Sequence, residues 1–419
     1  MTMPGAVRAS IRVLDSPLGS FAVALAVYGF VALTFGRKGL GQSDYPYFVY
    51  LADAFLHGQM ALVSVPTDTL DLVLFQGKTY LYWPPFPALM LTPLVALWGL
   101  ETSDGIVHLL AAALNVGLVS LLLKELGRQK IATVSSGQRA WITVFFAFGT
   151  VYFTLAPYAN VWHTGQVIGL GLSLAGHIVG LRFSGWRGMF TAGVLAGLAF
   201  LTRNPLLLSF FWLAWYCFRR EWAVAGVGRA AGSVCVAALP IAAAVTLYGV
   251  YNYARFGSAL DAGLAYHNMS GFLRADFDRY GAFSLHYLPI NLHYYLAALP
   301  YLAFLSGNAA TEFWMGGSLF LMSPLFFAGV WGITRDWERQ GWALAVACIV
   351  GMVPALLLMG TGAVQFGPRY TIDIAVPLLV ATAIGVERLP SKWLPLLVLV
   401  SIELYFPGTL ALGRALPHH

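Results

Sequence analysis

Long apolar stretches alternate with short polar stretches along most of the chain, a pattern that predicts membrane-spanning helices. A helix needs roughly 20 mainly apolar residues to cross the hydrocarbon core of a bilayer. Nine stretches approach this length: Leu18–Phe35, Gly105–Leu123, Ala140–Ala156, His163–Leu181, Ala230–Asn252, Gly316–Ile333, Gly341–Gly360, Thr371–Val386 and Trp393–Leu412. The apolar stretch from Gly188 to Phe218 would overshoot a bilayer as one helix. It is interrupted at Arg203, so we predict two short spans folded back there and eleven spans in all.

Two further apolar stretches, Trp83–Leu100 and Ser284–Ser306, compete for the role of span. If both crossed the membrane, nine basic residues between Lys124 and Arg229 would change sides. Lys and Arg prefer cytoplasmic loops, which rejects that arrangement. Both stretches contain prolines and aromatic residues, so we predict helices lying in the outer membrane interface.

The distribution of basic residues sets the predicted orientation. With a cytoplasmic N-terminus, fifteen of the 24 Lys and Arg lie inside: Arg8, Arg12, Lys124, Arg128, Lys130, Arg139, Arg182, Arg187, Arg219, Arg220, Arg229, Arg335, Arg339, Arg388 and Lys392. We therefore predict an all-α polytopic protein integral to the cell (inner) membrane, with its C-terminus outside. Residues 1–419 form a single integral-membrane domain, with a first long outer loop at 36–104 and a second at 253–315.

Composition agrees with this assignment. Of the 419 residues, 59% are hydrophobic and 10% charged, against about 25% charged in an average soluble domain. The mean hydropathy of +0.72 excludes a soluble globular protein. The net charge of +6 follows from the basic inner loops, so nucleic acid is not expected as a partner.

Acidic residues concentrate on the predicted outer side, which places any chemistry there. The first outer loop contains Asp44, Asp53, Asp68 and Asp71. Asp44 directly precedes Tyr45-Pro46, where a helix is expected to begin because proline suits a first turn. Asp44 is either a cap of that helix or the catalytic carboxylate. Asp53 falls on the opposite face of the same helix.

Three arginines are candidates to bind an anion. Arg203 lies between two short spans, where an unpaired charge is costly unless it faces a cavity or snorkels to the headgroups. Arg369 lies at the outer end of a span, as an anion clamp or as an ion-pair partner of Asp373. Arg255 follows another span, in the second outer loop.

Other polar and aromatic residues of the outer side are candidate substrate contacts. They are Asp53, Tyr82, His163, His267 and Tyr370. Aromatic rings suit sugar faces and membrane interfaces equally, so both alternatives stand. No His, Cys, Asp and Glu spacing is typical of a metal site, and we predict no metal ligands.

The order of several short motifs resembles the C-type (GT-C) integral-membrane glycosyltransferases, particularly bacterial members akin to aminoarabinose transferase and protein O-mannosyltransferase. The motifs are Asp44 in the first outer loop, Gly77-Lys78-Thr79-Tyr80 before Trp83-Pro84-Pro85, Thr202-Arg203-Asn204-Pro205, Asn252-Tyr253-x-Arg255-Phe256-Gly257, Gly317-Ser318 with Ser323-Pro324, and Gly367-Pro368-Arg369-Tyr370. Each motif is short; their order and common side carry the resemblance.

The resemblance implies transfer of a sugar from a polyprenyl-phosphate donor to a lipid, glycan or protein acceptor. It also implies that Asp44 is the base and that arginines hold the donor phosphate. Many relatives carry paired acids where Asp44 stands alone, which leaves a divalent cation open. A transporter or lipid flippase is the alternative, although such proteins are expected to have repeated halves with coupling charges at mid-membrane.

Overall fold

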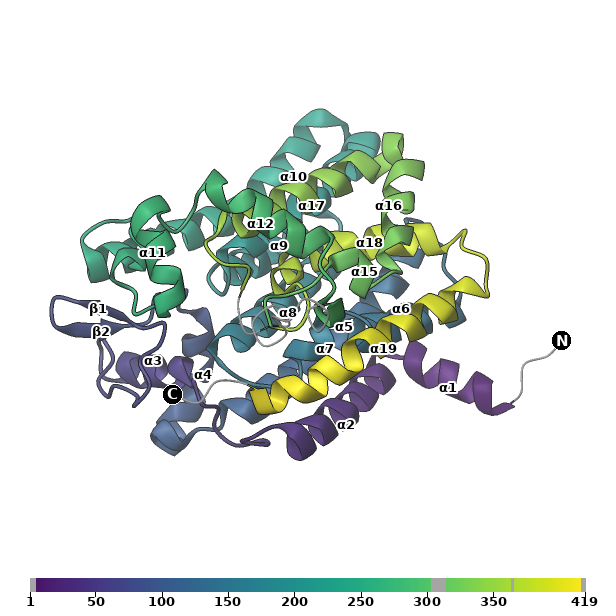
Figure 1. Cartoon of the computed structure of the whole chain (residues 1–419). Coiled ribbons are helices and arrows are strands. Elements are labelled where there is room, and N and C mark those ends of the chain that lie inside the picture. Colours follow the sequence, from purple (N-terminus) through teal and green to yellow (C-terminus); the bar gives the residue numbers. More distant parts are fainter. Residues whose placement is uncertain (1–4, 303–313, 363–364, 416–419) are drawn as a thin grey trace.

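The computed structural model describes residues 5–302, 314–362 and 365–415, and these residues are mainly helical (Figure 1). The α-helices are α1 (Gly5–Asp15), α2 (Pro17–Phe35), α3 (Tyr47–Leu56), α4 (Phe86–Trp98), α5 (Asp104–Arg128), α6 (Ser136–Phe148), α7 (Tyr152–Leu155), α8 (Val161–Arg182), α9 (Gly185–Phe200), α10 (Phe210–Phe256), α11 (Gly271–Tyr280), α12 (Leu288–Leu296), α15 (Leu319–Met322), α16 (Phe326–Arg335), α17 (Trp342–Leu357), α18 (Ala375–Val386) and α19 (Trp393–Ala415). A two-stranded antiparallel hairpin, β1 (Val73–Phe75) and β2 (Lys78–Tyr80), lies in the first outer loop.

Short helical turns connect several of these helices. They are η1 (Gly99–Glu101), η2 (Asn204–Ser209), η3 (Leu264–Tyr266), η4 (Leu285–Tyr287), η5 (Pro300–Leu302), the π-helical turn η6 (Trp337–Gly341) and η7 (Arg369–Ile374).

Seven helical segments of the described chain are long and apolar enough to cross a membrane, which confirms the prediction of an all-α polytopic membrane protein. They are Pro17–Phe35, Asp104–Arg128, Val161–Arg182, Asn204–Phe256, Trp337–Leu357, Arg369–Val386 and Trp393–Arg414. Asn204–Phe256 covers two predicted spans, because a positive φ of 82° at Gly226 bends α10 there.

The other predicted spans are helical but shorter or interrupted. The predicted span Ala140–Ala156 divides into α6 and α7 after Gly149, and α9 has 16 residues. The predicted span Gly316–Ile333 divides into α15 and α16 at Ser323-Pro324, where proline lacks the N–H that would continue the helix.

The prediction that the chain folds back at Arg203 is confirmed. α9 ends at Phe200, and α10 begins at Phe210 after the short turn η2. α9 packs closely against the second half of α10: a Cβ on Gly193 would lie 2.2 Å from the carbonyl oxygen of Ala237. This small-residue contact lets two apolar helices approach where side-chain burial alone gives little driving force in lipid.

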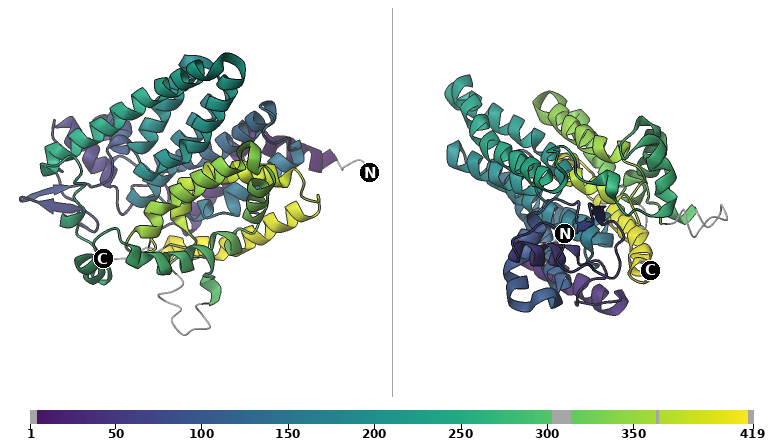
Figure 2. Two further views of the ribbon diagram at one scale, coloured as in Figure 1. Left: turned by 90° about the horizontal axis from the view of Figure 1, so that it is seen from above. Right: turned by 90° about the vertical axis from the view of Figure 1, so that its left-hand side faces the viewer.

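The loops predicted to be cytoplasmic gather at one end of the bundle. Arg139, at the start of α6, forms a bidentate ion pair with Asp15 at the end of α1. Gln138 donates to the carbonyl of Val386, the last residue of α18, and Arg339 donates to the carbonyl of Lys130. Figure 2 shows α1 and the α18–α19 connection at this end and the β-hairpin at the opposite end.

Helices are present in the outer-loop stretches that were predicted to be helical. Helix α3 begins at Tyr47 after Pro46, as predicted, and α4 covers most of Trp83–Leu100. α3 is more buried than a surface helix, because most of its residues are apolar around the whole circumference and it packs against α4 and η1. In Ser284–Ser306 the structure describes η4, α12 and η5; the rest of that stretch lies outside the described residues.

Candidate active site

Backbone pairing between the two outer loops shapes the site. The turn between β1 and β2 has positive φ at Gln76 and Gly77, as a two-residue hairpin turn requires. Next to this hairpin, the N–H of Asp71 donates to the carbonyl of Asn268, and the N–H of Asn268 donates to the carbonyl of Leu72, both at 2.8 Å. The second outer loop is thereby fixed against the first, although about 200 residues separate them in sequence.

Asp71 accepts two hydrogen bonds from side chains of different segments. His267 Nε2 lies 2.7 Å from Asp71 Oδ1, and Trp162 Nε1 donates to Asp71 Oδ2 at 2.7 Å. Trp162 comes from the first turn of α8, which Asn160 caps by accepting from the N–H of His163. Asp71 therefore joins both outer loops to a membrane helix.

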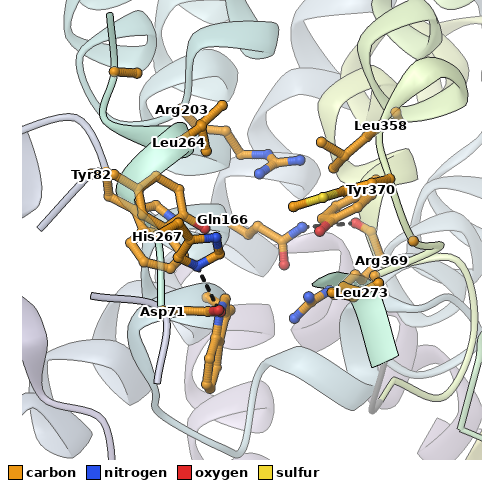
Figure 3. A pocket seen from close by; sticks show the side chains of 18 of the residues that line it. Asp71, Tyr82, Gln166, Arg203, Leu264, His267, Leu273, Leu358, Arg369 and Tyr370 are labelled. Atoms are coloured by element: carbon orange, nitrogen blue, oxygen red, sulfur yellow. Dashed lines mark hydrogen bonds and ion pairs between the residues drawn. The ribbon is translucent and has the colours of Figure 1, made fainter. Parts of the chain in front are cut away.

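A cavity of about 780 Å³ lies beneath these loops, between the ends of α8, α9, α17 and η7 (Figure 3). One part of its lining is polar or aromatic and the other part is apolar. The polar and aromatic part includes Asp68, Asp71, Tyr82, Trp83, Asn160, Trp162, His163, Gln166, Arg203, His267, Arg369, Tyr370 and Asp373. The apolar part includes Leu264, Phe272, Leu273, Phe283, Pro354, Leu358 and Met359.

Arg203 lines this cavity while forming a buried ion pair with Asp373. Its Nε and Nη2 atoms donate to the two carboxylate oxygens of Asp373, at 2.5 and 2.7 Å. The guanidinium also lies 4.9 Å from the centre of the Tyr370 ring. This pairing differs from the sequence-based alternative, in which Asp373 pairs with Arg369.

Arg369 has no carboxylate partner among the described residues, because Arg203 occupies Asp373. The residue is 7% exposed, and its guanidinium lies 5.2 Å from the centre of the Tyr370 ring. Its Nε atom is buried with no hydrogen-bond partner within the described part of the chain. A buried, unpaired guanidinium facing a cavity is a site for a phosphate or carboxylate.

Gln166 connects α8 with Arg369 and faces the same cavity. Its Nε2 donates to the carbonyl of Arg369 at 3.1 Å, and Figure 3 shows its amide extending into the space between Arg203 and Arg369. One turn earlier on α8, His163 lies 2.8 Å through Nδ1 from the carbonyl of Tyr158. Gln166 was not among the candidate substrate contacts, although it lies one helical turn from His163 on the same predicted span.

The structure places Asp44 outside the residues that line this cavity. Its carboxylate lies 3.8 Å from Arg37 and 3.6 Å from Lys38, and its side chain is 32% exposed. The neighbouring Tyr45 packs against Trp162, with ring centres 4.8 Å apart. Burial raises the pKa of Tyr45, and the charges of Asp68, Asp44 and Asp71 raise it further.

The remaining predicted site residues divide into two groups. Tyr82, His163, His267 and Tyr370 line the cavity, whereas Asp53 and Arg255 do not. Asp53 Oδ1 lies 3.6 Å from His57 Nδ1 on the same helix. Arg255 is buried and donates to the carbonyl of Leu81 and to Asn252 Oδ1, which joins the end of α10 to the first outer loop. Its geometry favours a structural role.

Within the described residues, no group of three or more His, Cys, Asp and Glu side chains is arranged to hold a metal ion. Of the first-loop acids Asp44, Asp68 and Asp71, Asp71 is engaged by His267 and Trp162, and Asp44 lies beside Arg37 and Lys38. This donor set therefore does not present a preformed cation site.

The fold and cavity define an integral membrane protein with a roofed site at one end of its helices, and three solved structures are similar to the chain over most of its length. No family model and no curated protein sequence matches the chain. ArnT from Cupriavidus metallidurans bound to undecaprenyl phosphate is 15% identical, with a TM-score of 0.47 over 89% of this chain and 60% of that chain.

The apo oligosaccharyltransferase of Archaeoglobus fulgidus is 15% identical, with a TM-score of 0.42 over 94% of this chain and 55% of that one. AglB of the same organism, in complex with an inhibitory peptide and a dolichol-phosphate, is 14% identical, with a TM-score of 0.41 over 94% of this chain and 55% of that chain. The chain spans 55–60% of their lengths, and likenesses this distant transfer no residue's role to it.

Proposed function

We propose that this protein is a glycosyltransferase that moves a sugar from a polyprenyl-phosphate donor to a lipid, glycan or protein acceptor. The reaction takes place in the cavity beneath the two outer loops, at the outer face of the cell (inner) membrane. A single displacement at the anomeric carbon inverts its configuration.

The observation that carries this proposal is the unpaired guanidinium of Arg369 in a cavity with a large apolar wall. A lipid-linked phosphate needs both features: a cation for the phosphate and an apolar surface for the chain. Arg203 contributes less charge, because Asp373 neutralises it in the resting protein. Arg369 is therefore the main phosphate ligand, with Arg203 as the second.

The proposed reaction needs one base and one group that stabilises the leaving phosphate. The acceptor hydroxyl oxygen forms a bond to the anomeric carbon while the bond from that carbon to the phosphate oxygen breaks. A carboxylate of the first outer loop takes the hydroxyl proton, and polyprenyl phosphate leaves with the bonding electrons, stabilised by Arg369. Asp44 is the base that the sequence predicts, and Asp71 is the competitor that lines the cavity.

The orientation rests on charge. The helix ends that meet around Arg139 carry the excess of Lys and Arg, so that end is cytoplasmic and the N-terminus lies with it. A cysteine introduced at Thr79 should react with an impermeant thiol reagent in intact cells, and one at Lys130 should not. The reverse pattern would invert the protein and place the cavity inside.

Donor turnover in detergent separates an enzyme from a transporter or flippase. Purified protein is mixed with undecaprenyl-phosphate-linked hexoses and an extract of acceptor membranes, and donor consumption is followed by mass spectrometry. We expect donor loss without a sealed vesicle, and a loss about 10²–10³-fold slower with Arg369→Ala. Donor movement in vesicles with no chemical turnover would replace the proposal with a flippase.

A further inference from the structure

Three of the eight buried side-chain atoms without hydrogen-bond partners in the described chain belong to residues that line this one cavity. They are Gln166 Oε1, His267 Nδ1 and Arg369 Nε. A buried polar atom that lacks a partner destabilises the fold, so such atoms are few in folded proteins. Because all three belong to residues that line one cavity, this cavity is a place where a ligand can supply the missing partners.

The chemistry of the three atoms specifies what that ligand must carry. Gln166 uses its NH₂ group on the carbonyl of Arg369, which leaves its oxygen as an acceptor. The carboxylate of Asp71 favours a proton on His267 Nε2, which leaves Nδ1 as an acceptor. Arg369 Nε is a donor. Two acceptors and one donor match a group rich in hydroxyls next to an anionic oxygen.

We propose that Gln166 and His267 form the subsite that reads hydroxyl groups of the donor sugar. This inference rests on the proposed function, since Arg369 holds the phosphate to which the sugar is directly bonded. Because Gln166 donates to the backbone of Arg369 itself, its amide oxygen lies beside the phosphate site. Figure 3 shows the Gln166 amide between His267 and Arg369, with its oxygen directed into the open space.

Aromatic side chains complete this subsite. Tyr82 stacks on Trp83 with ring centres 3.8 Å apart, and both line the cavity. Tyr82 also meets His267 edge to face at 4.9 Å. Burial and the charge of Asp71 raise the pKa of Tyr82, so its hydroxyl stays protonated. These rings offer an apolar face for a sugar ring whose hydroxyls reach Gln166 and His267.

Binding of lipids with and without a sugar tests the subsite. The probes are undecaprenyl phosphate, its mannosyl and glucosyl esters, and the mono-deoxy analogues of both esters, measured on wild type and Gln166→Met in detergent. In the wild type, one deoxy analogue should bind about 10- to 100-fold more weakly than its parent. Gln166→Met should lose this discrimination and bind sugar-free undecaprenyl phosphate as wild type does.

A matched control variant and two further outcomes test the proposed sugar subsite. Gln340→Met removes another buried glutamine, which bonds Trp212 and Asp336 away from the cavity, and should keep the discrimination. If Gln166→Met weakened sugar-free lipid as much as hexosyl lipid, Gln166 would only position Arg369, and the subsite would be overturned. Equal binding of sugar-free and hexosyl lipid by wild type would mean that the three atoms hold water. Binding of neither lipid would overturn the proposed function itself.

Discussion

Arg139 and Arg369 lie at opposite ends of the helix bundle, and their guanidinium groups have different surroundings. Arg139 donates to both oxygens of Asp15 and to the carbonyl of Val134, and so joins α1 to α6. Arg369 is buried beside a cavity, with no carboxylate partner among the described residues. Both are arginines near helix ends in an apolar protein, yet only one has its charge satisfied by the fold.

This difference separates structural polar groups from functional ones. Polar side chains at the basic end mainly close helix ends: Arg220 donates to Gly180 and Leu181, and Arg219 donates to the carbonyl of Arg339. Buried atoms without a partner are not confined to the cavity end, since Arg220 Nε also lacks one, but at the cavity end three of them belong to residues that line a single cavity. A protein keeps such atoms where a ligand satisfies them, so the comparison predicts which substitutions affect stability and which affect turnover.

The largest expected loss of turnover comes from removing the general base, for which Asp44 and Asp71 are the two candidates. Removal of a general base costs typically 10²–10⁴-fold in rate. Asp44→Asn and Asp71→Asn should therefore differ by that factor in donor turnover, with the catalytic one inactive and still able to bind undecaprenyl phosphate. Asparagine keeps the shape of either side chain and can still accept a hydrogen bond.

Asp53→Asn is the control for this pair, because Asp53 lies outside the cavity lining and should retain most activity. If Asp44→Asn is inactive, the base acts from beside Arg37 and Lys38, and the cavity must rearrange around the acceptor. Near-normal turnover in both variants would move the base to Asp68, which also lines the cavity.

A smaller loss is expected from the donor-phosphate ligand. Arg369→Ala should lower turnover by about 10²–10³-fold, the usual cost of removing one group that stabilises developing negative charge. Arg369→Lys should recover only part of the rate, because lysine lacks the planar fork that grips phosphate with two hydrogen bonds. Thermal unfolding should change little, since the fold gives this guanidinium no carboxylate partner to lose among the described residues.

Arg255→Lys is the comparison for Arg369→Lys. Arg255 is buried too, but its donors are engaged by Leu81 and Asn252. It should lower the unfolding temperature with little effect on the affinity for undecaprenyl phosphate. Loss of donor affinity in Arg255→Lys with an unchanged unfolding temperature would restore Arg255 as a phosphate ligand.

The spans were predictable from sequence because each is a long apolar run, and burial in lipid depends on composition rather than on exact contacts. The fold-back at Arg203 was predictable for the same reason, since a single helix would have been too long. The pairing of Arg203 with Asp373 was not, because 170 residues separate them and Asp373 is only one turn from Arg369. The sequence spacing favoured an Arg369–Asp373 pair, whereas in the structure Asp373 pairs with Arg203.

The site was harder to predict because backbone pairing between two loops builds it. The sequence favoured Asp44 over Asp71 as the catalytic carboxylate. Nothing in the sequence indicated that the backbone of Asn268 would pair with that of Asp71 and bring His267 to the Asp71 carboxylate. Gln166 offered a weak signal: it follows His163 by one helical turn, so the two residues share a face of α8. Such a polar face on an apolar helix is the feature that could have located the cavity.

The smallest effect on turnover is expected from a substitution at the basic end, where the proposed structural role of Arg139 can be tested directly. Arg139→Ala leaves Asp15 without its bidentate partner and should lower the free energy of unfolding by about 1.5–3 kcal/mol, the usual worth of a hydrogen bond to a charged group. Donor turnover per folded molecule should stay at the wild-type level, because Arg139 is far from the cavity. Thermal unfolding in detergent and turnover at low temperature measure the two quantities separately.

If Arg139→Ala lost turnover while its unfolding temperature stayed unchanged, the division between a structural end and a functional end would fail. The cavity would then depend on the packing of α1 against α6.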